Sequence, residues 1–121
     1  MKLLIVDDSN IIRKAIHKYV QKYNLDSIEQ ANDGSSALEI FKKTLPDIVT
    51  MDITMPKMDG LTCLTEMLKI KPDAKIIIIS ALGDKATALD AMEKGAYTFI
   101  SKPFPEEKLD EVIEKIRGGN S

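Results

Sequence analysis

The feature that most constrains the fold of this chain is a regular alternation between short apolar runs and longer amphipathic stretches. The short runs are rich in β-branched or aromatic residues and are expected to form strands. Their positions are 3–6, 27–31, 47–51, 76–79 and 97–100. The first, third and fourth runs are nearly unbroken in apolar character, which is typical of strands covered on both faces of a parallel sheet. The second run alternates polar and apolar residues, which suits an edge of that sheet.

Between these runs, apolar residues recur at helical spacing and predict one helix after each strand. The apolar stripes consist of Ile12, Ile16, Tyr19, Val20 and Tyr23; Ala37, Leu38 and Phe41; Leu61, Leu64 and Leu68; Ala86, Leu89 and Met92; and Leu109, Val112, Ile113 and Ile116. Ser9 is placed to cap the first helix. The last helix is expected to begin at Pro105, because the fixed φ of proline and the acids that follow it favour a helix N-terminus. Gly95 and Gly118 are expected to stop the helices before them.

This alternation predicts an α/β fold, because right-handed crossovers place the helices on both faces of a doubly wound parallel sheet. We expect a (βα)5 flavodoxin-like sandwich with a five-stranded parallel sheet of order 2-1-3-4-5. The chain of 121 residues has the size of one domain. Residues 1–117 are expected to form this domain, and 118–121 a flexible tail that is either a natural end or the start of a linker.

Composition narrows the chemistry by exclusion. The formal net charge is −2, whereas nucleic-acid-binding proteins are typically rich in basic residues. The first apolar run meets acids too soon for a signal peptide or a membrane span, so the protein is expected to be soluble and cytoplasmic. The single cysteine, Cys63, excludes an intrachain disulfide, and with the single histidine, His17, it argues against a transition-metal site. Carboxylate oxygens, the ligands of Mg²⁺ and Ca²⁺, remain as metal ligands.

Polar residues at the ends of the predicted strands point to a common site. They are Asp7 and Asp8 after the first strand, Asp52 after the third, Ser80 after the fourth and Lys102 after the fifth. Ligands of open α/β sheets bind at the carboxyl ends of the strands, where the strand order reverses. Neighbouring first and third strands bring three carboxylates together, and such a cluster requires a cation, for which Mg²⁺ and the Lys102 ammonium are suited. A turn former or helix cap explains one strand-end aspartate, such as Asp8 or Asp59, but not polar groups after four strands.

Four motifs at these strand ends resemble those of the CheY-like receiver domain of bacterial response regulators, the phosphoacceptor module of two-component signalling. They are Ile-Val-Asp-Asp-Ser at 5–9, Met-Asp-Ile-Thr-Met-Pro-Lys-Met-Asp-Gly at 51–60, Ile-Ser-Ala at 79–81 and Phe-Ile-Ser-Lys-Pro-Phe at 99–104. Their joint order and spacing are specific, and the resemblance covers essentially the whole chain. The sequence is therefore similar to receivers of the single-domain type.

The resemblance implies a phosphoprotein whose Asp52 takes a phosphoryl group from a phosphohistidine on a sensor histidine kinase, with the carboxylate as nucleophile and an acyl phosphate as product. It implies a Mg²⁺ cofactor held by Asp8, Asp52 and the backbone carbonyl of Thr54, with Asp7 acting through water. Such a protein is not an enzyme, but it promotes its own phosphorylation and its own slow dephosphorylation.

The resemblance also implies a conformational switch around the acceptor. Lys102 is expected to pair with the phosphoryl oxygens, and Ser80 to donate a hydrogen bond to another of them. A cis peptide bond between Lys102 and Pro103 is expected to direct the lysine. Inward movement of Ser80 makes room for Phe99 to turn, which changes the surface formed by the fourth helix, the fifth strand and the fifth helix.

Two positions that vary across the family tune the hydrolysis of the acyl phosphate, and here they hold Thr54 and Leu82. Neither side chain is an acid or an amide that orients water, so we expect slow self-dephosphorylation. His17 lies between apolar positions of the first helix and is expected to face solvent. Cys63 is interpreted as a small packed residue without chemistry.

The implied partners are a sensor histidine kinase, a downstream target and a phosphatase, with the protein itself a monomer that binds neither nucleic acid nor membrane. The motif at 51–56 favours chemotaxis, with a flagellar motor switch protein as the target. Alternatives are a phosphorelay intermediate and the receiver part of a regulator with an output domain. A phosphatase of the haloacid dehalogenase type also uses a strand-end aspartate, but it needs a second acid where Thr54 stands. A flavodoxin-like phosphate site is disfavoured because Asp7 and Asp8 repel phosphate.

Overall fold

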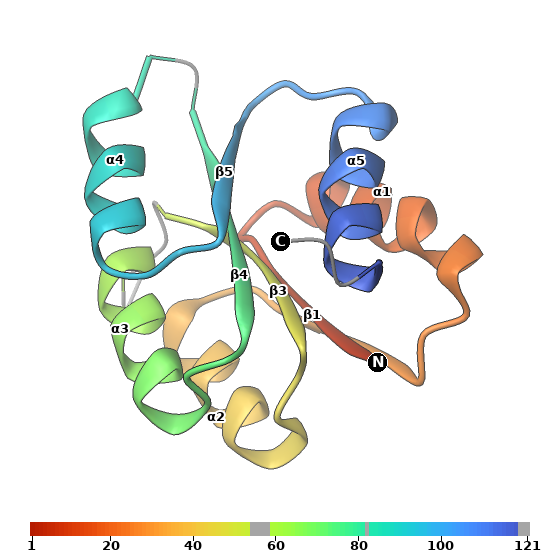
Figure 1. The fold of residues 1–121 in the computed structure, drawn as a ribbon, viewed down its shortest axis with the longest axis horizontal. Coiled ribbons are helices and arrows are strands. Elements are labelled where there is room, and N and C mark those ends of the chain that lie inside the picture. The colour runs from red at the N-terminus through yellow and green to blue at the C-terminus, as the bar shows by residue number, and fades with distance from the viewer. Residues whose placement is uncertain (54–58, 82, 119–121) are drawn as a thin grey trace.

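The fold is a five-stranded parallel sheet with helices on both faces (Figure 1). The computed structural model describes residues 1–53, 59–81 and 83–118. The strands are β1 (Lys2–Val6), β2 (Ser27–Ala31), β3 (Ile48–Asp52), β4 (Lys75–Ser80) and β5 (Thr98–Ser101). The helices are α1 (Asn10–Val20), the 3₁₀ turn η1 (Gln21–Tyr23), α2 (Gly34–Thr44), α3 (Gly60–Ile70), α4 (Lys85–Glu93) and α5 (Glu106–Arg117). The sheet order β2-β1-β3-β4-β5 confirms the predicted fold class and topology.

Two apolar layers hold the helices to the sheet, because alternate side chains of each strand point to opposite faces. On one face, α2, α3 and α4 cover the sheet with side chains such as Phe41 and Leu64. On the other face, α1 and α5 cover it with side chains such as Ile16 and Ile113. Full coverage explains why β1, β3 and β4 are buried almost throughout, whereas β2 is exposed at Glu29 and Gln30, as expected of an edge strand.

Helix ends follow the capping signals in the sequence. The Ser9 hydroxyl accepts a hydrogen bond from the Ile12 N–H at 3.3 Å and caps α1, as predicted. The α5 helix begins directly after Pro105, and Gly118 ends it, also as predicted. Gly95, immediately after the cap of α4, adopts a φ of 109°, a conformation that side chains rarely tolerate. These local signals mark the start of α1 and the ends of α4 and α5.

The predicted apolar face of α4 is wrong at Ala86 and Leu89, whereas Met92 packs against the apolar layer as expected. The structure buries Ala88 and Ala91 against the sheet, whereas Ala86 is exposed and Leu89 is 50% exposed. Apolar residues occur on more than one side of this helix, so spacing alone does not choose its buried face. Alanine has the smaller side chain and lets the helix axis approach the strands, which leaves the larger Leu89 on the outer surface.

Among the described residues, no helix is both long and apolar enough to cross a bilayer. Residues 119–121 of the predicted tail lie outside the described part of the chain, so its flexibility remains a prediction.

Candidate functional site

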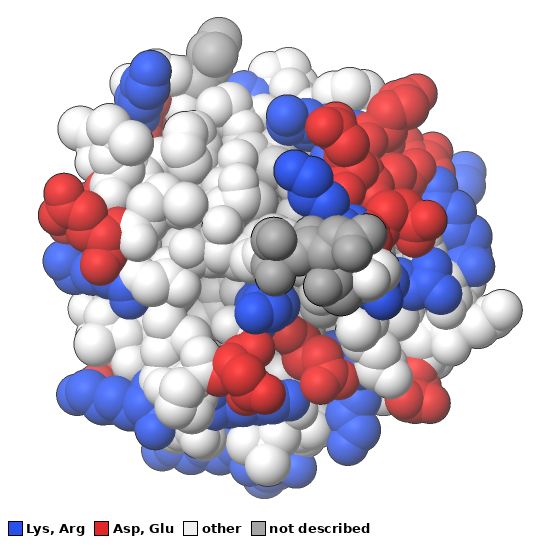
Figure 2. All heavy atoms as spheres, viewed as in Figure 1, with Lys and Arg blue, Asp and Glu red and all other residues white. Residues whose placement is uncertain are grey.

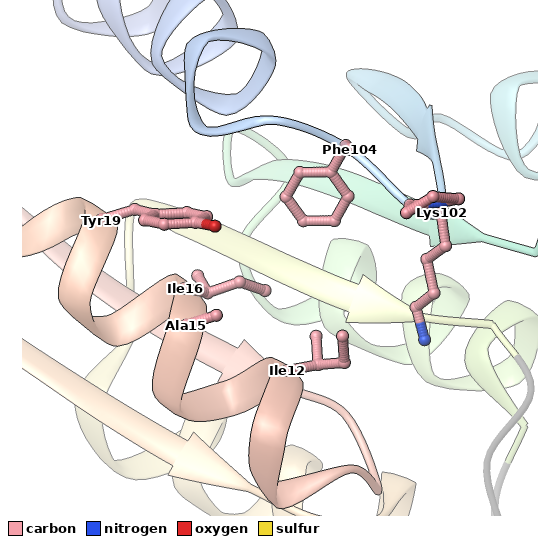
Figure 3. Close-up of a pocket in the computed structure, with 7 residues that line it drawn as sticks. Ile12, Ala15, Ile16, Tyr19, Lys102 and Phe104 are labelled. Atoms are coloured by element: carbon pink, nitrogen blue, oxygen red, sulfur yellow. The ribbon is translucent and has the colours of Figure 1, made fainter.

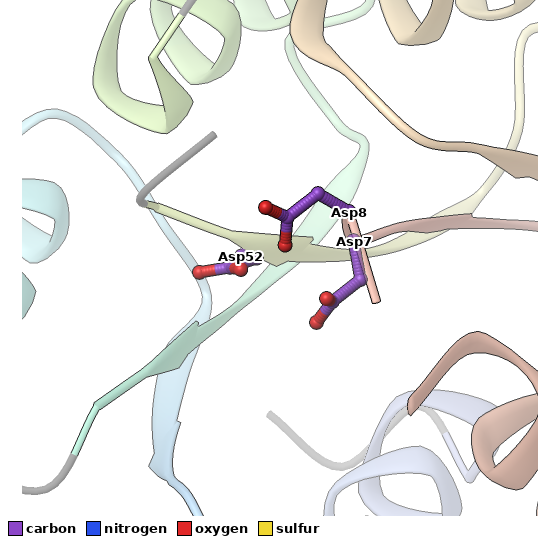
Figure 4. A group of neighbouring side chains, drawn as sticks. All are labelled: Asp7, Asp8 and Asp52. Carbon is purple, nitrogen blue, oxygen red and sulfur yellow. The ribbon is translucent and has the colours of Figure 1, made fainter. Parts of the chain in front are cut away.

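The strand ends place three aspartates at one point on the carboxyl edge of the sheet. Val6 of β1 pairs with Met51 of β3, so Asp7, directly after β1, lies beside Asp52, the last residue of β3. One carboxylate oxygen from each of Asp7, Asp8 and Asp52 lies within 4.8 Å of the other two (Figure 4). The convergence predicted from the strand ends is therefore present.

The three carboxylates differ in their access to water. Asp7 is 1% exposed and Asp52 is 4% exposed, whereas Asp8 lies at the surface. Burial raises the pKa of the Asp7 carboxyl above its usual value, although a hydrogen bond from the Ser9 N–H and the charge of Lys102 act in the opposite direction. The Ser9 nitrogen lies 2.9 Å from Asp7 Oδ1. A buried acid beside two further acids is costly unless a cation compensates it.

Lys102 supplies part of that compensation from the loop after β5. Its Nζ lies 3.2 Å from Asp7 Oδ2 and 3.4 Å from Asp52 Oδ2. Burial by itself lowers the pKa of the Lys102 ammonium, but the carboxylates of Asp52 and Asp7 outweigh burial and raise it. The lysine therefore stays charged. The peptide bond between Lys102 and Pro103 is cis, as the family resemblance implied.

An apolar cavity of about 160 Å³ lies beside this lysine, between α1 and the loop after β5 (Figure 3). Its walls are Ile12, Ala15, Ile16, Tyr19, Lys102, Pro103 and Phe104. The apolar lining suits the methylene stem of the lysine, whose ammonium reaches the acids instead of the cavity. The cavity thus helps to direct Lys102 and does not itself present ligands for an ion.

Ser80 and Phe99 lie at the same edge but on the other face of the sheet. Ser80 ends β4 and is 1% exposed. Phe99 of β5 is half-buried and packs against the apolar layer under α2, α3 and α4. Ile78 pairs with Phe99 and belongs to the same layer, so Ser80, two residues further along β4, is on this face as well. The structure therefore places the two residues expected to act as a switch on the same face of neighbouring strands.

Gly60 permits the start of α3 to approach the backbone of Asp52 and Ile53 closely. A Cβ atom at this position would lie 2.5 Å from the Cα atom of Ile53 and 2.9 Å from the carbonyl oxygen of Asp52. The Gly60 N–H instead donates to the Ile53 carbonyl at 3.1 Å. The first residue of α3 thus packs directly on the end of β3, which fixes the backbone that carries Asp52.

Arg13 of α1 is a residue of the site that the sequence analysis missed. Its Nη1 donates to the backbone carbonyl of Asp7 at 2.5 Å, and its Nε donates to Gln30 Oε1 at 3.3 Å. One feature of the sequence could have pointed to Arg13. It is a basic residue near the start of a helix, where acidic residues are usually preferred.

The remaining predicted residues are Thr54, Leu82, His17 and Cys63. Thr54 and Leu82 lie outside the described residues, so the carbonyl ligand and the slow dephosphorylation remain predictions. His17 is half-buried, with its Nδ1 3.3 Å from Gln21 Nε2. Cys63 is fully buried, as expected, and burial raises the pKa of its thiol to about 12.

The donor set fits a hard divalent cation. Three carboxylates within 4.8 Å of one another offer only oxygen ligands, which Mg²⁺ prefers. Two of them are buried and one is exposed, so an ion at this point has a path from solvent and keeps room for water or a phosphoryl oxygen. The site thus combines a buried carboxylate, oxygen ligands suited to a cation and an ammonium beside them, a set of groups that is able to support phosphoryl transfer.

Comparison with known families agrees with this chemistry. Residues 3–114 match the model of the response regulator receiver domain. The chain is 41% identical over 115 residues to the chemotaxis protein CheY of Thermotoga maritima, which spans 95% of this chain and 96% of that protein. It is also 38% identical over 124 residues to a protein-glutamate methylesterase/protein-glutamine glutaminase of Hahella chejuensis, spanning 95% of this chain but 34% of that protein.

Solved structures give the same picture. The fold is similar to a chain in the crystal structure of a CheX–CheY–BeF3–Mg²⁺ complex from Borrelia burgdorferi, with a TM-score of 0.89 and 39% identity. That match covers 97% of this chain and 89% of the other.

Proposed function

Because the chain belongs to the family of response regulator receiver domains, we propose that Asp52 is its phosphoacceptor and that Asp7, Asp8 and Asp52 hold Mg²⁺ with the carbonyl of Thr54. The observation that carries this proposal is the convergence of three carboxylates and one ammonium at the carboxyl edge of the sheet. As a CheY-like receiver of two-component signalling, the protein passes on a signal that a histidine kinase supplies.

The chain's own groups divide the work of the transfer. The Asp52 carboxylate attacks the phosphorus atom, the bond to the donor nitrogen breaks, and the donor histidine leaves. Lys102 Nζ, 3.4 Å from Asp52 Oδ2, is placed to pair with oxygens of the incoming group. When bound, Mg²⁺ neutralises charge on the transferring phosphoryl oxygens. Asp7 keeps Lys102 in place through its contact of 3.2 Å.

Phosphorylation then biases the switch. The new phosphoryl oxygens accept a hydrogen bond from the Ser80 hydroxyl, which draws the end of β4 toward Asp52. Phe99 lies on the same face of the neighbouring strand and turns into the space that is vacated. A differential interaction of about 1–3 kcal/mol between the two states is typical of such coupling.

The surface that changes comprises α4, β5 and α5, and it is proposed to bind the downstream target. Acidic side chains gather over α5, basic side chains border them, and an uncharged region lies further toward α4 (Figure 2). A target that docks there is expected to carry basic side chains next to an apolar contact. Relatives named chemotaxis protein CheY support a role in chemotaxis, and for that role we propose a flagellar motor switch protein as the target.

A second role is supported by one comparison. The methylesterase of Hahella chejuensis carries the matching region in about a third of its length, so receivers like this one also occur within longer regulators. Detection of an output domain attached to this chain in the natural gene product would favour that role over the single-domain one.

Incubation of the purified protein with acetyl phosphate and Mg²⁺ tests the acceptor. Intact-mass spectrometry is expected to show one added phosphoryl group, which Asp52→Asn abolishes. Asp47→Asn, which alters an aspartate just before the same strand, is the matched control and is expected to leave labelling intact. Labelling that survives Asp52→Asn would overturn the assignment.

The target is tested with purified components. A flagellar motor switch protein from the same organism is expected to bind more tightly to the phosphorylated protein than to the Asp52→Asn variant treated in the same way. Equal binding to both would reject this target while leaving the phosphoacceptor assignment intact.

A further inference from the structure

Asp8 differs from the other two acids in how it is held. Asp7 accepts from the Ser9 N–H and contacts Lys102, and Asp52 also contacts Lys102. Among the residues that the structure describes, no side chain hydrogen-bonds to or pairs with the Asp8 carboxylate. The position of this proposed metal ligand therefore depends on the backbone of the loop between β1 and α1.

Arg13 holds that backbone. The Asp7 carbonyl belongs to the peptide group that joins Asp7 to Asp8, and Arg13 Nη1 donates to it at 2.5 Å. On the other side of the same residue, the Asp7 N–H donates to the Ala31 carbonyl at 3.1 Å. With both ends of Asp7 fixed, the plane of the following peptide is fixed, and so is the direction in which Asp8 leaves the chain.

The guanidinium is itself held by two further elements. Its Nε donates to Gln30 Oε1 on β2 at 3.3 Å, and its Nη2 donates to Asn10 Oδ1 at the start of α1. Three nitrogens of one planar group thus reach β2, α1 and the loop between β1 and α1. A lysine offers a single nitrogen and cannot make this set of contacts from one rigid plane.

We propose that Arg13 is a positioning residue of the divalent-metal site, which acts by fixing the Asp7–Asp8 peptide and through it the Asp8 carboxylate. This inference rests on the proposed function, because it assumes that the three acids bind Mg²⁺. Groups that orient metal ligands without touching the metal typically contribute tenfold or more to its affinity.

Whether removal of Arg13 weakens or strengthens Mg²⁺ binding distinguishes a positioning role from a purely electrostatic one. Arg13 is positive and lies near an acidic site. If it acted only through its charge, its removal would strengthen the binding of a cation. If it positions Asp8, its removal weakens that binding. A role limited to stability would lower the melting temperature and leave the Mg²⁺ dissociation constant of the folded protein unchanged.

Isothermal titration of the full chain with Mg²⁺ tests the proposal. Arg13→Ala is expected to raise the dissociation constant about tenfold, whereas Lys14→Ala, which removes the same charge from the exposed neighbouring residue, is expected to leave it unchanged or slightly lower. Arg13→Gln keeps a helix-favouring residue and carries the same expectation should Arg13→Ala fail to fold. Arg13→Lys is expected to fall between wild type and alanine.

The outcomes distinguish this inference from the function on which it rests. Wild-type protein that binds no Mg²⁺ would overturn both. Wild-type and Lys14→Ala proteins that bind Mg²⁺, together with folded Arg13 variants that bind it equally well or more tightly, would overturn the positioning role alone.

Discussion

The two ends of the sheet both carry aspartates, yet these acids meet opposite environments. At the amino end, Asp47 accepts from the Lys2 N–H at 2.8 Å and pairs with Lys71 at 3.1 Å. The hydrogen bond from Lys2 holds the pKa of Asp47 below its usual value, although burial opposes it and Lys71 assists. At the carboxyl end, burial raises the pKa of Asp7. An aspartate therefore stabilises the fold at the amino end of the sheet, whereas a buried aspartate at the carboxyl end destabilises it.

The difference shows what a binding site requires. The acid at the amino end is satisfied by the chain itself, so it has nothing to offer a ligand. The acids at the carboxyl end lie within 4.8 Å of one another, and Lys102 compensates them only in part. In the proposed function, a divalent cation supplies the positive charge that these acids still lack. The acids that lower the stability of the carboxyl end are thus the same acids that are proposed to bind the cation.

Removal of the two lysines should give the largest contrast. Lys102→Ala leaves buried carboxylates without their ammonium and is expected to lower the free energy of unfolding by about 3 kcal/mol, the low end for breaking buried pairs because the lysine is partly exposed. Lys71→Ala breaks a more exposed contact and is expected to cost about 1 kcal/mol or less. Urea denaturation at pH 7 without divalent ions measures both, and equal losses would contradict the comparison.

Addition of Mg²⁺ should sharpen the contrast further. A ligand of the folded state at about twenty times its dissociation constant stabilises by about 1.8 kcal/mol. Thermal unfolding is expected to show this gain for wild type and for Asp47→Asn, but not for Asp8→Asn. A gain that persists in Asp8→Asn, or one that disappears in Asp47→Asn, would place the cation elsewhere.

Substitution of one aspartate at each end of the sheet should change the free energy of unfolding in opposite directions. Asp7→Asn removes a buried charge and is expected to raise the free energy of unfolding without Mg²⁺ by about 1 kcal/mol. Asp47→Asn loses a charge-assisted acceptor and is expected to lower it by about 1 kcal/mol, after allowance for solvent exposure. Chemical denaturation at pH 7 decides the signs, and two losses of similar size would remove the distinction.

The smallest expected effect is on the pH dependence of the free energy of unfolding. The pKa of Asp47 is lowered on folding, so its stabilisation is present above the pKa of the unfolded chain and is lost as pH falls through the folded value. The pKa of Asp7 is raised, so the folded state binds this proton more tightly and its penalty is relieved as pH falls. In urea denaturation below pH 5, Asp47→Asn should make the acid loss shallower and Asp7→Asn should make it steeper. The reverse order would contradict the two assignments.

The sequence predicted the fold well because its main signals are local. Continuous β-branched runs such as 76–79 specify buried strands, and the strands lie within one residue of their predicted bounds. The face of α4 was wrong at Ala86 and Leu89 because alanines and larger apolar residues occupy several sides of that helix, and only the packing of Ala88 and Ala91 against the sheet selects one.

The site was predictable where it depends on strand ends and unpredictable where it depends on the backbone. Asp7 and Asp8 follow β1 and Asp52 ends β3. The sheet topology makes these two strands neighbours, so the convergence of the three acids could be expected. The contact of Arg13 with the Asp7 carbonyl could not, because a main-chain acceptor leaves no mark in the pattern of side chains. The approach of Gly60 to the end of β3 is of the same kind.

Direct mapping of the phosphorylated residue tests the central claim most plainly. Borohydride reduces an aspartyl phosphate to homoserine, which peptide mass spectrometry locates in the sequence. After treatment with acetyl phosphate and Mg²⁺, the account predicts homoserine at position 52 and an unchanged aspartate at Asp47. Homoserine at another aspartate, or a phosphoryl group found on His17, would contradict it.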